Sequence, residues 1–248
     1  MEKKQPKFSH VSYATDYMQI ATDKVKEYFG HELSGKSVLD IPAGNGWIGE
    51  HISKFGAQTI SADINEAKPH FHQVNMEDHL PFQDQTFDAV VCCEGIEHVF
   101  SPFKLFSELV RVLKPGGILV ITTPNVQSLY SRWQFLCTGY LFQFDPYNKT
   151  VIDAKQQLDK GHISPVTYGQ LYYYAEHFGM SIATPTGGRM KRVSLLPVLL
   201  PTLIVGLWWN YRDWRRTSSR KDRLSIMQHL FNPRVLMSRS LIFIATKL

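Results

Sequence analysis

Two carboxylates and two imidazoles have residue types and spacings that could do acid–base or metal chemistry. Glu94, Glu97 and His98 form a Glu-x-x-Glu-His group directly after the apolar run 87–93, and His162 follows within 160–165. Their oxygen and nitrogen atoms could hold a divalent cation such as Mg²⁺. Alternatively, His98 acts with Glu97 as a general base or polar contact for an acceptor hydroxyl, because histidine titrates near neutral pH. A third interpretation is structural, with Glu97 and His98 capping the next helix.

A second group of residues is suited to binding a nucleotide-like ligand. Asp40 ends a short apolar run and is followed by Gly44 and Gly46, where the backbone can approach a ligand closely. The loop leads into a predicted helix, whose N-terminal N–H groups favour an anion. Asp63 ends the next apolar run, where a carboxylate can accept from both hydroxyls of a ribose. Tight turns and helix caps would account equally for each feature taken alone.

The elements that must position these residues alternate between strands and helices. Hydrophobic periodicity and glycine or proline breaks predict strands at 37–41, 58–63, 70–75, 87–93, 118–123, 180–184 and 241–246, with helices within 12–29, 46–55, 102–113 and 168–178. Residues 113–117 form a stop-and-turn signal before the fifth strand. Alternation of this kind predicts an α/β protein with a parallel, doubly wound sheet.

These motifs together resemble the class I S-adenosylmethionine-dependent methyltransferases. The matches are 38–46, Asp63, Leu80-Pro81-Phe82 with Phe87-Asp88, Glu97-His98 and Leu113 to Gly117, all in family order within 36–125. The resemblance implies a Rossmann-like sheet of seven strands, mostly parallel with an antiparallel last strand. It also implies S-adenosyl-L-methionine as cofactor. The loop departs from the family at Pro42-Ala43, where the pattern usually begins Gly-Cys or Gly-Ser.

The resemblance also implies which residues would contact the cofactor. Asp40 and the loop backbone would face its methionine end, Asp63 its ribose, and Asn75 with Met76 its adenine. Asn75 replaces the usual acid, although its amide oxygen can still accept from the adenine amine; a simple turn residue is the alternative. The complete expected set is Asp40, Ala43, Gly44, Gly46, Asp63, Ile64, Asn75, Met76 and Glu94.

The acid and histidine group carries a narrower, partial resemblance. Ubiquinone-biosynthesis O-methyltransferases and small-RNA 3′-terminal 2′-O-methyltransferases have similar acid-acid-His patterns with a histidine further along the chain. In both groups the metal would hold the hydroxyls of the acceptor. By that resemblance the metal ligands would be Glu94, Glu97, His98 and His162.

Composition indicates a cytoplasmic protein with one unusual segment. The chain has 248 residues, 44% of them hydrophobic, and three cysteines without metal-type spacing, two of them adjacent in an apolar run. Its N-terminus lacks the apolar stretch of a signal peptide. We expect an N-terminal helical segment at 1–35, a methyltransferase domain at 36–186 and 240–248, and an insertion at 187–239 between the last two strands.

The insertion is both basic and hydrophobic. It holds eleven Lys and Arg against two Asp, a net charge of +9, whereas the rest of the chain carries −4. It also contains nineteen consecutive uncharged residues, Val193 to Tyr211, too few and too proline-rich for a regular spanning helix. Since the last strand must return to the sheet, we expect 190–236 to lie on the cytoplasmic face of a membrane as a peripheral contact. A hydrophobic cap or dimer contact is the alternative.

The sequence therefore predicts a methyltransferase that O-methylates an amphipathic or lipid-linked small molecule at a membrane surface. One alternative is an RNA-directed methyltransferase whose basic insertion grips phosphates. The tryptophan-rich run beside those charges, and the lack of a known RNA-binding motif, argue against a nucleic-acid partner. Another alternative is a non-catalytic protein that only binds S-adenosylmethionine.

Overall fold

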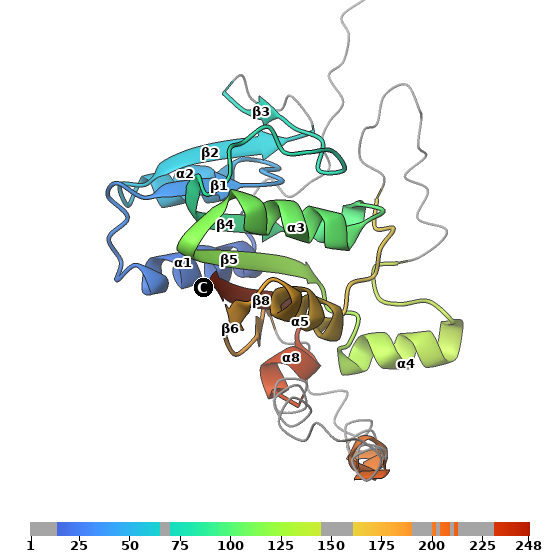
Figure 1. The fold of residues 1–248 in the computed structure, drawn as a ribbon. Helices are drawn as coiled ribbons and strands as arrows, with labels where there is room; N and C mark the ends of the chain where they lie inside the picture. The colour runs from blue at the N-terminus through green and yellow to red at the C-terminus, as the bar shows by residue number, and fades with distance from the viewer. Residues whose placement is uncertain are drawn as a thin grey trace, which may run out of the picture.

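The computed structural model describes residues 14–64, 70–144, 161–189, 200–201, 204–208, 211–212 and 231–248. Its central feature is a sheet with the order β3-β2-β1-β4-β5-β8-β6, in which a short β7 also pairs with β8 (Figure 1). The strands are β1 (Ser37–Asp40), β2 (Gln58–Asp63), β3 (His72–Gln73), β4 (Phe87–Cys93), β5 (Leu113–Pro124), β6 (Met180–Ile182), β7 (Thr186–Gly187) and β8 (Ser240–Lys247).

The first five strands are parallel, and β8 runs antiparallel between β5 and β6. The predicted α/β class, the parallel sheet and the antiparallel last strand are therefore confirmed. The eighth strand, β7, was not predicted from the sequence. It adds two residues beside the beginning of β8, where Thr186 pairs with Ile242 and Gly187 with Leu241.

Helices cover both faces of the sheet, as expected for a doubly wound fold (Figure 1). On one face, α3 (Pro102–Val112) and α5 (Tyr168–His177) bury side chains such as Phe106 and Tyr168. On the other face, α1 (Asp16–Tyr28) and α2 (Trp47–Ser53) bury Ala21, Val25 and Ile48. The helix α4 (Leu129–Thr138), the 3₁₀ turn η1 (Ile96–His98) and α8 (Pro233–Met237) follow the carboxyl ends of strands or precede β8.

Local sequence explains where these helices begin and end. Ser101 caps α3 beside a proline in its first turn, and Thr167 and Gln170 form a reciprocal capping box at α5. Helix α4 begins at Ser128, whose hydroxyl accepts from Ser131 N–H, and ends at Gly139 in the left-handed conformation. The described part of the predicted first helix is confirmed as α1; residues 1–13 lie outside the described part.

The expected turn at 113–117 is wrong as a boundary, because β5 already begins at Leu113. Leu113 pairs with Phe87, and the next pair joins Ile118 to Ala89, so the turn residues form an irregularity within the ladder. Lys114 in this irregularity donates to Asp88 Oδ2 at 2.7 Å. Strand three is likewise shorter than expected, only His72–Gln73.

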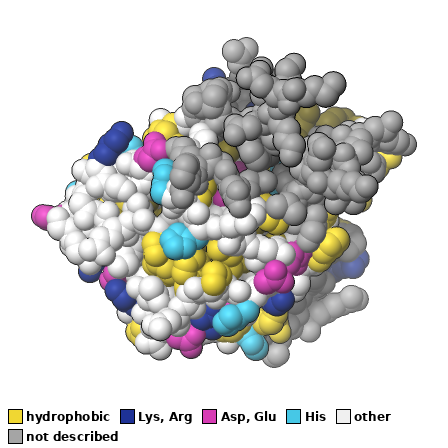
Figure 2. Space-filling view, turned by 90° about the horizontal axis from the view of Figure 1, so that it is seen from above, with side chains coloured by type: hydrophobic (Ala, Val, Ile, Leu, Met, Phe, Trp, Pro, Cys, Tyr) yellow, Lys and Arg dark blue, Asp and Glu magenta, His cyan; other side chains and the backbone are white. Residues whose placement is uncertain are grey.

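At the β3 end the hydrophobic core reaches the surface. Ile60, Met76 and Phe82 are only partly buried against it, and His72 packs edge-on against Phe82 at 6.1 Å between ring centroids. Figure 2 looks onto the molecule from this end and shows hydrophobic side chains gathered near its centre, with histidines beside them.

Candidate functional site

The loop between β1 and α2 forms one side of the candidate site. Its two predicted glycines both have positive φ, 54° at Gly44 and 79° at Gly46, and Gly46 is the N-cap of α2. Ala43 is buried and donates its N–H to Ala62 O at 2.8 Å, which ties the loop to β2. The left-handed conformations explain why glycine is needed at both positions.

Asp40 is fully buried at the carboxyl end of β1. Its Oδ2 accepts from Gly49 N–H at 3.1 Å, whereas its Oδ1 has no hydrogen-bond partner among the described residues. Burial raises the pKa of this carboxyl to about 8, and the hydrogen bond from Gly49 only partly offsets the shift. A buried carboxylate oxygen without a donor is a place where a cationic or N–H group of a ligand would be stabilised.

Asp63 lies at the end of β2, next to the same loop. Its side chain is 5% exposed, and its Oδ2 accepts from Gly44 N–H at 2.8 Å. Ile64, the next residue, is half-buried and accepts from Gln73 through its carbonyl at 3.2 Å. The structure thus brings Asp40, the glycine loop and Asp63 to one edge of the sheet, as the sequence predicted.

Asn75 and Met76 follow β3 at this edge. The Asn75 side-chain oxygen accepts from Glu77 N–H at 3.1 Å, and its amide nitrogen donates to Asp78 at 2.9 Å. Asn75 therefore stabilises a local turn, which is the alternative that the sequence left open. Its oxygen has a second lone pair that could still accept from a ligand.

The opposite side of the site is built on η1, directly after β4. Glu97 is fully buried, and its Oε2 accepts from Thr123 Oγ1 at 3.1 Å. Its Oε1 lies 3.9 Å from His98 Nε2 and 4.0 Å from His162 Nε2. The two imidazole rings meet edge-on, 4.8 Å apart.

His162 reaches this group because its segment is attached to η1 through the backbone. The carbonyl of Glu97 accepts from the N–H groups of Ile163 and Ser164, both at 3.0 Å. Ser164 Oγ also donates to Val99 O at 2.7 Å. His162 Nδ1 lies 3.0 Å from Gln143 O, so the ring is held from two sides and its Nε2 faces Glu97.

Ligand atoms of Glu97, His98 and His162 all lie within 4.8 Å of one another. Glu94, the fourth ligand expected from the sequence, is not part of this cluster. Glu94 has a positive φ of 48°, and its Oε1 accepts from Thr122 Oγ1 at 3.1 Å. Burial raises the pKa of Glu94 to about 7, partly offset by Thr122 and by the positive charge of Arg239.

Sequence reasoning missed three residues near this edge. Thr123 anchors Glu97, and its place at the carboxyl end of an apolar strand was the signal that could have revealed it. Tyr17 of α1 is the second: burial raises the pKa of its hydroxyl, and the negative charges of Glu94 and Glu97 add to the shift. Arg239 lies directly before β8, and its carbonyl accepts from Asn125 N–H at 2.8 Å.

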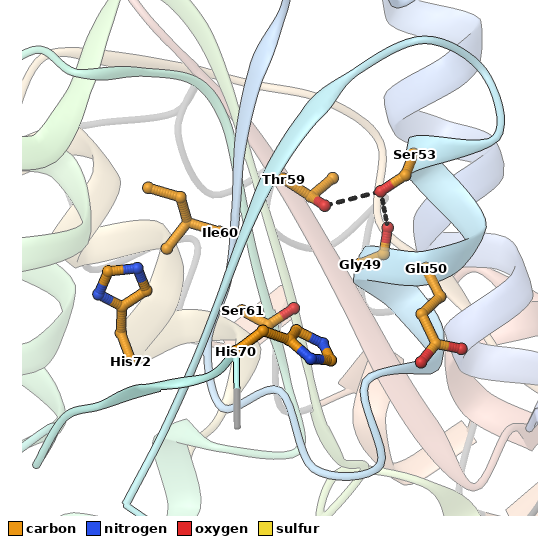
Figure 3. Close-up of a pocket in the computed structure, with 8 residues that line it drawn as sticks. All are labelled: Gly49, Glu50, Ser53, Thr59, Ile60, Ser61, His70 and His72. Atoms are coloured by element: carbon orange, nitrogen blue, oxygen red, sulfur yellow. Dashed lines mark hydrogen bonds between the residues drawn. The ribbon is translucent and has the colours of Figure 1, made fainter. Parts of the chain in front are cut away.

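A separate pocket lies between α2 and β2 and contains none of the predicted site residues (Figure 3). Its lining residues are Gly49, Glu50, Ser53, Thr59, Ile60, Ser61, His70 and His72. The Ser53 hydroxyl lies 2.7 Å from both Gly49 O and Thr59 Oγ1, so these polar groups join the helix to the strand. We interpret this pocket as a gap in the packing between α2 and β2, and we do not include it in the candidate site.

Comparison with known proteins finds methyltransferases, in agreement with the family resemblance of the sequence. A family model described as "Methyltransferase domain" matches residues 13–184. A ubiquinone biosynthesis O-methyltransferase of Coxiella burnetii is 29% identical over 168 residues, which cover 62% of this chain and 68% of that protein. A demethylmenaquinone methyltransferase of Clavibacter sepedonicus is 36% identical over 110 residues, covering 38% of this chain and 44% of that protein.

Solved structures share the fold. A SAM-dependent methyltransferase from Archaeoglobus fulgidus aligns with a TM-score of 0.56 at 20% identity, covering 93% of this chain and 94% of that one. The YcgJ protein from Bacillus subtilis aligns with a TM-score of 0.53 at 15% identity, covering 93% of this chain and 97% of that one. At such identities the likeness concerns the fold alone.

Proposed function

The chain belongs to the class I S-adenosylmethionine-dependent methyltransferases, and from that premise we propose that it methylates an oxygen atom of an amphipathic or lipid-linked small molecule at a membrane surface. Bound S-adenosylmethionine would supply an electrophilic methyl group on a positively charged sulfur. The chain's own residues must bind this donor, orient the acceptor and accept the proton that the acceptor hydroxyl loses.

The residues present fit the methyl donor. The buried Oδ1 of Asp40, which has no hydrogen-bond partner among the described residues, is suited to its ammonium group. Asp63 would accept from the ribose hydroxyls while keeping its bond from Gly44. The partly buried Met76 offers an apolar surface for the adenine, and Asn75 has a remaining acceptor lone pair.

The main support for methylation of an oxygen atom is the cluster formed by Glu97, His98 and His162. A hydroxyl acceptor must lose its proton as the methyl group arrives, and a half-buried imidazole beside a buried carboxylate can accept it. We assign this role to His98. Glu97 lies beside His98 and orients it, while Thr123 and the attached 163–164 segment hold Glu97 in place.

The same group supports a second candidate role, binding of a divalent cation. One carboxylate and two imidazoles within 4.8 Å are a donor set that suits Mn²⁺ or Zn²⁺ better than Mg²⁺, which prefers oxygen ligands. Titration of the protein with MnCl₂, followed by calorimetry, tests this role. Binding that is lost in His162→Ala supports it, and no binding to the wild-type protein at neutral pH excludes it.

The described residues of the insertion support the proposal that this segment contacts a membrane surface. The residues described between 200 and 212 are helical, and six of their apolar side chains are more than half exposed: Leu200, Ile204, Val205, Leu207, Trp208 and Tyr211. The Arg212 guanidinium lies 5.7 Å from the centre of the Trp208 ring. None of the helices in the described part combines the length and hydropathy needed to span a bilayer. Exposed aromatic and basic residues together suit the headgroup region.

Incubation of the purified protein with S-adenosylmethionine and membrane lipid extract tests the proposal. Mass spectrometry should find a lipid-soluble product one methylene unit heavier than its precursor. His98→Asn should greatly slow the formation of that product, while binding of S-adenosylhomocysteine remains. A product found only in the water-soluble fraction would contradict the proposed acceptor class.

A further inference from the structure

Arg239 stands at the acceptor side of the sheet edge, although it belongs to the basic insertion. Its carbonyl accepts from Asn125 N–H at 2.8 Å, and Asn125 directly follows β5. Thr123, two residues earlier, donates to Glu97. The backbone of Arg239 therefore lies next to the carboxyl end of β5, the strand whose Thr123 holds Glu97.

The Arg239 side chain rests on an aromatic platform. Its Cζ lies 5.4 Å from the centre of the Phe142 ring, within the range of a cation–π contact. Phe142 is itself fixed, since its N–H donates to Oγ of the fully buried Ser131 at 3.0 Å. Tyr130 packs edge-on against Phe142, with 5.4 Å between ring centroids. The platform orients the guanidinium before any ligand arrives.

The guanidinium of Arg239 has no ion-pair partner within the described part of the chain. Among the described residues no carboxylate lies within ion-pair distance of its guanidinium, and Arg239 is exposed. Glu94 is near enough to feel the charge, but its carboxylate accepts from Thr122 instead. Arg239 N–H donates to Arg189 O at 3.3 Å, so a second exposed arginine lies directly beside it.

We propose that Arg239, held on Phe142 and reinforced by the neighbouring charge of Arg189, binds an anionic group of the acceptor, either a carboxylate or a phosphate ester. A guanidinium takes both groups through paired N–H donors, and a pre-oriented one loses less entropy on binding. The inference rests on the proposed function, because it assigns the group to the molecule that receives the methyl. It narrows the acceptor from any amphipathic hydroxyl compound to an anionic one.

The test uses the full-length protein saturated with S-adenosylhomocysteine. Calorimetry compares 3,4-dihydroxybenzoate with catechol, which has the same hydroxyls but lacks the carboxylate. Flotation compares phosphatidylcholine vesicles with and without phosphatidic acid, which presents the phosphate at a lipid surface. The variants are Arg239→Gln and Arg239→Lys. Arg234→Gln, which changes an exposed arginine of α8, is the matched control for the calorimetric comparison.

We expect 3,4-dihydroxybenzoate to bind about tenfold or more tightly than catechol, as charge-assisted bonds allow. Arg239→Gln should remove this difference, Arg239→Lys should keep part of it, and Arg234→Gln should keep all of it. Loss of the phosphatidic acid effect in Arg239→Gln also supports the site, with a lipid phosphate as its source.

Three results would overturn the inference. These are no preference for either anionic probe in the wild-type protein, a preference that survives in Arg239→Gln, and a parallel loss of S-adenosylhomocysteine affinity in that variant. The last would assign Arg239 to the donor carboxylate. A wild-type protein that does not bind S-adenosylhomocysteine would instead disprove the proposed function, so the two failures are distinguishable.

Discussion

The ring of Pro42 lies against Gly95. A Cβ added at Gly95 would overlap Pro42 Cδ and would lie 2.9 Å from Pro42 Cγ and 3.1 Å from Cys92 Sγ. Pro42 belongs to the loop between β1 and α2, whereas Gly95 begins the segment that carries Glu97 and His98. Pro42, where the loop departs from the usual family pattern, therefore packs against this segment and joins the two sides of the candidate site.

Replacement of Gly95 by alanine tests that contact. Gly95 has a φ of −127°, which alanine tolerates, so the cost is steric and should be about 1–3 kcal/mol of unfolding free energy. Urea denaturation measures the loss. Gly169→Ala in α5, where a Cβ would meet only Thr167 Oγ1 at 3.9 Å, should not destabilise the protein. Equal stability of the two variants would contradict the contact.

Asp63 should bind the ribose while holding the glycine loop. In Asp63→Asn the amide oxygen can still accept from Gly44 N–H, so the melting temperature should change little. The charged acceptor for the ribose is lost, and S-adenosylhomocysteine should bind about 10- to 100-fold more weakly by calorimetry. Asp23→Asn, on the exposed face of α1, is the control. Unchanged affinity in Asp63→Asn would refute the ribose assignment.

Because of Asp40, the unfolding free energy of the ligand-free protein should fall as the pH rises. Its pKa is raised to about 8 in the folded state, against about 4 when unfolded, so the folded state holds the proton more tightly. The stabilising contribution of protonated Asp40 is complete below pH 4 and is lost as the pH rises towards 8.

Asp40→Asn removes this dependence, and its stability relative to the wild-type protein should grow between those two pH values. Calorimetric melting at several pH values, without ligand, measures the difference. A stability difference for Asp40→Asn that does not vary with pH would refute the raised pKa.

His98→Asn should separate catalysis from donor binding. Loss of a general base typically lowers kcat about 10²- to 10⁴-fold, whereas binding of S-adenosylhomocysteine should persist. Methyl transfer from labelled S-adenosylmethionine to membrane lipid extract supplies the rate. His177→Asn, on an exposed part of α5, should be fully active. Full activity of His98→Asn would exclude His98 as the base.

Ile204→Glu tests the membrane surface without disturbing the core. Ile204 is 61% exposed, so the protein should fold, but a carboxylate at the headgroup level should oppose docking. Flotation with anionic vesicles should fall about tenfold. Tyr173→Glu, at a 66% exposed position on α5, should float like the wild-type protein. Equal loss in both variants would mean that 200–212 is not the docking surface.

The sequence alone determined the sheet, its parallel strands and the position of the residues proposed to bind the methyl donor. Those features depend on short-range sequence patterns. An apolar run predicts a buried strand, and residues that follow parallel strands lie together at one edge of the sheet. Asp40, Gly44, Gly46 and Asp63 could be placed there without coordinates. The antiparallel last strand followed from family resemblance rather than from any local pattern.

Only the tertiary structure decided the arrangement of side chains around Glu97. His162 reaches Glu97 through backbone bonds across 65 residues, and Glu94, although it is next to the group in sequence, turns towards Thr122. No spacing rule predicts either result, because a loop's path depends on long-range contacts. The position of Arg239 beside Asn125 has the same cause, since it required the pairing of β8 with β5.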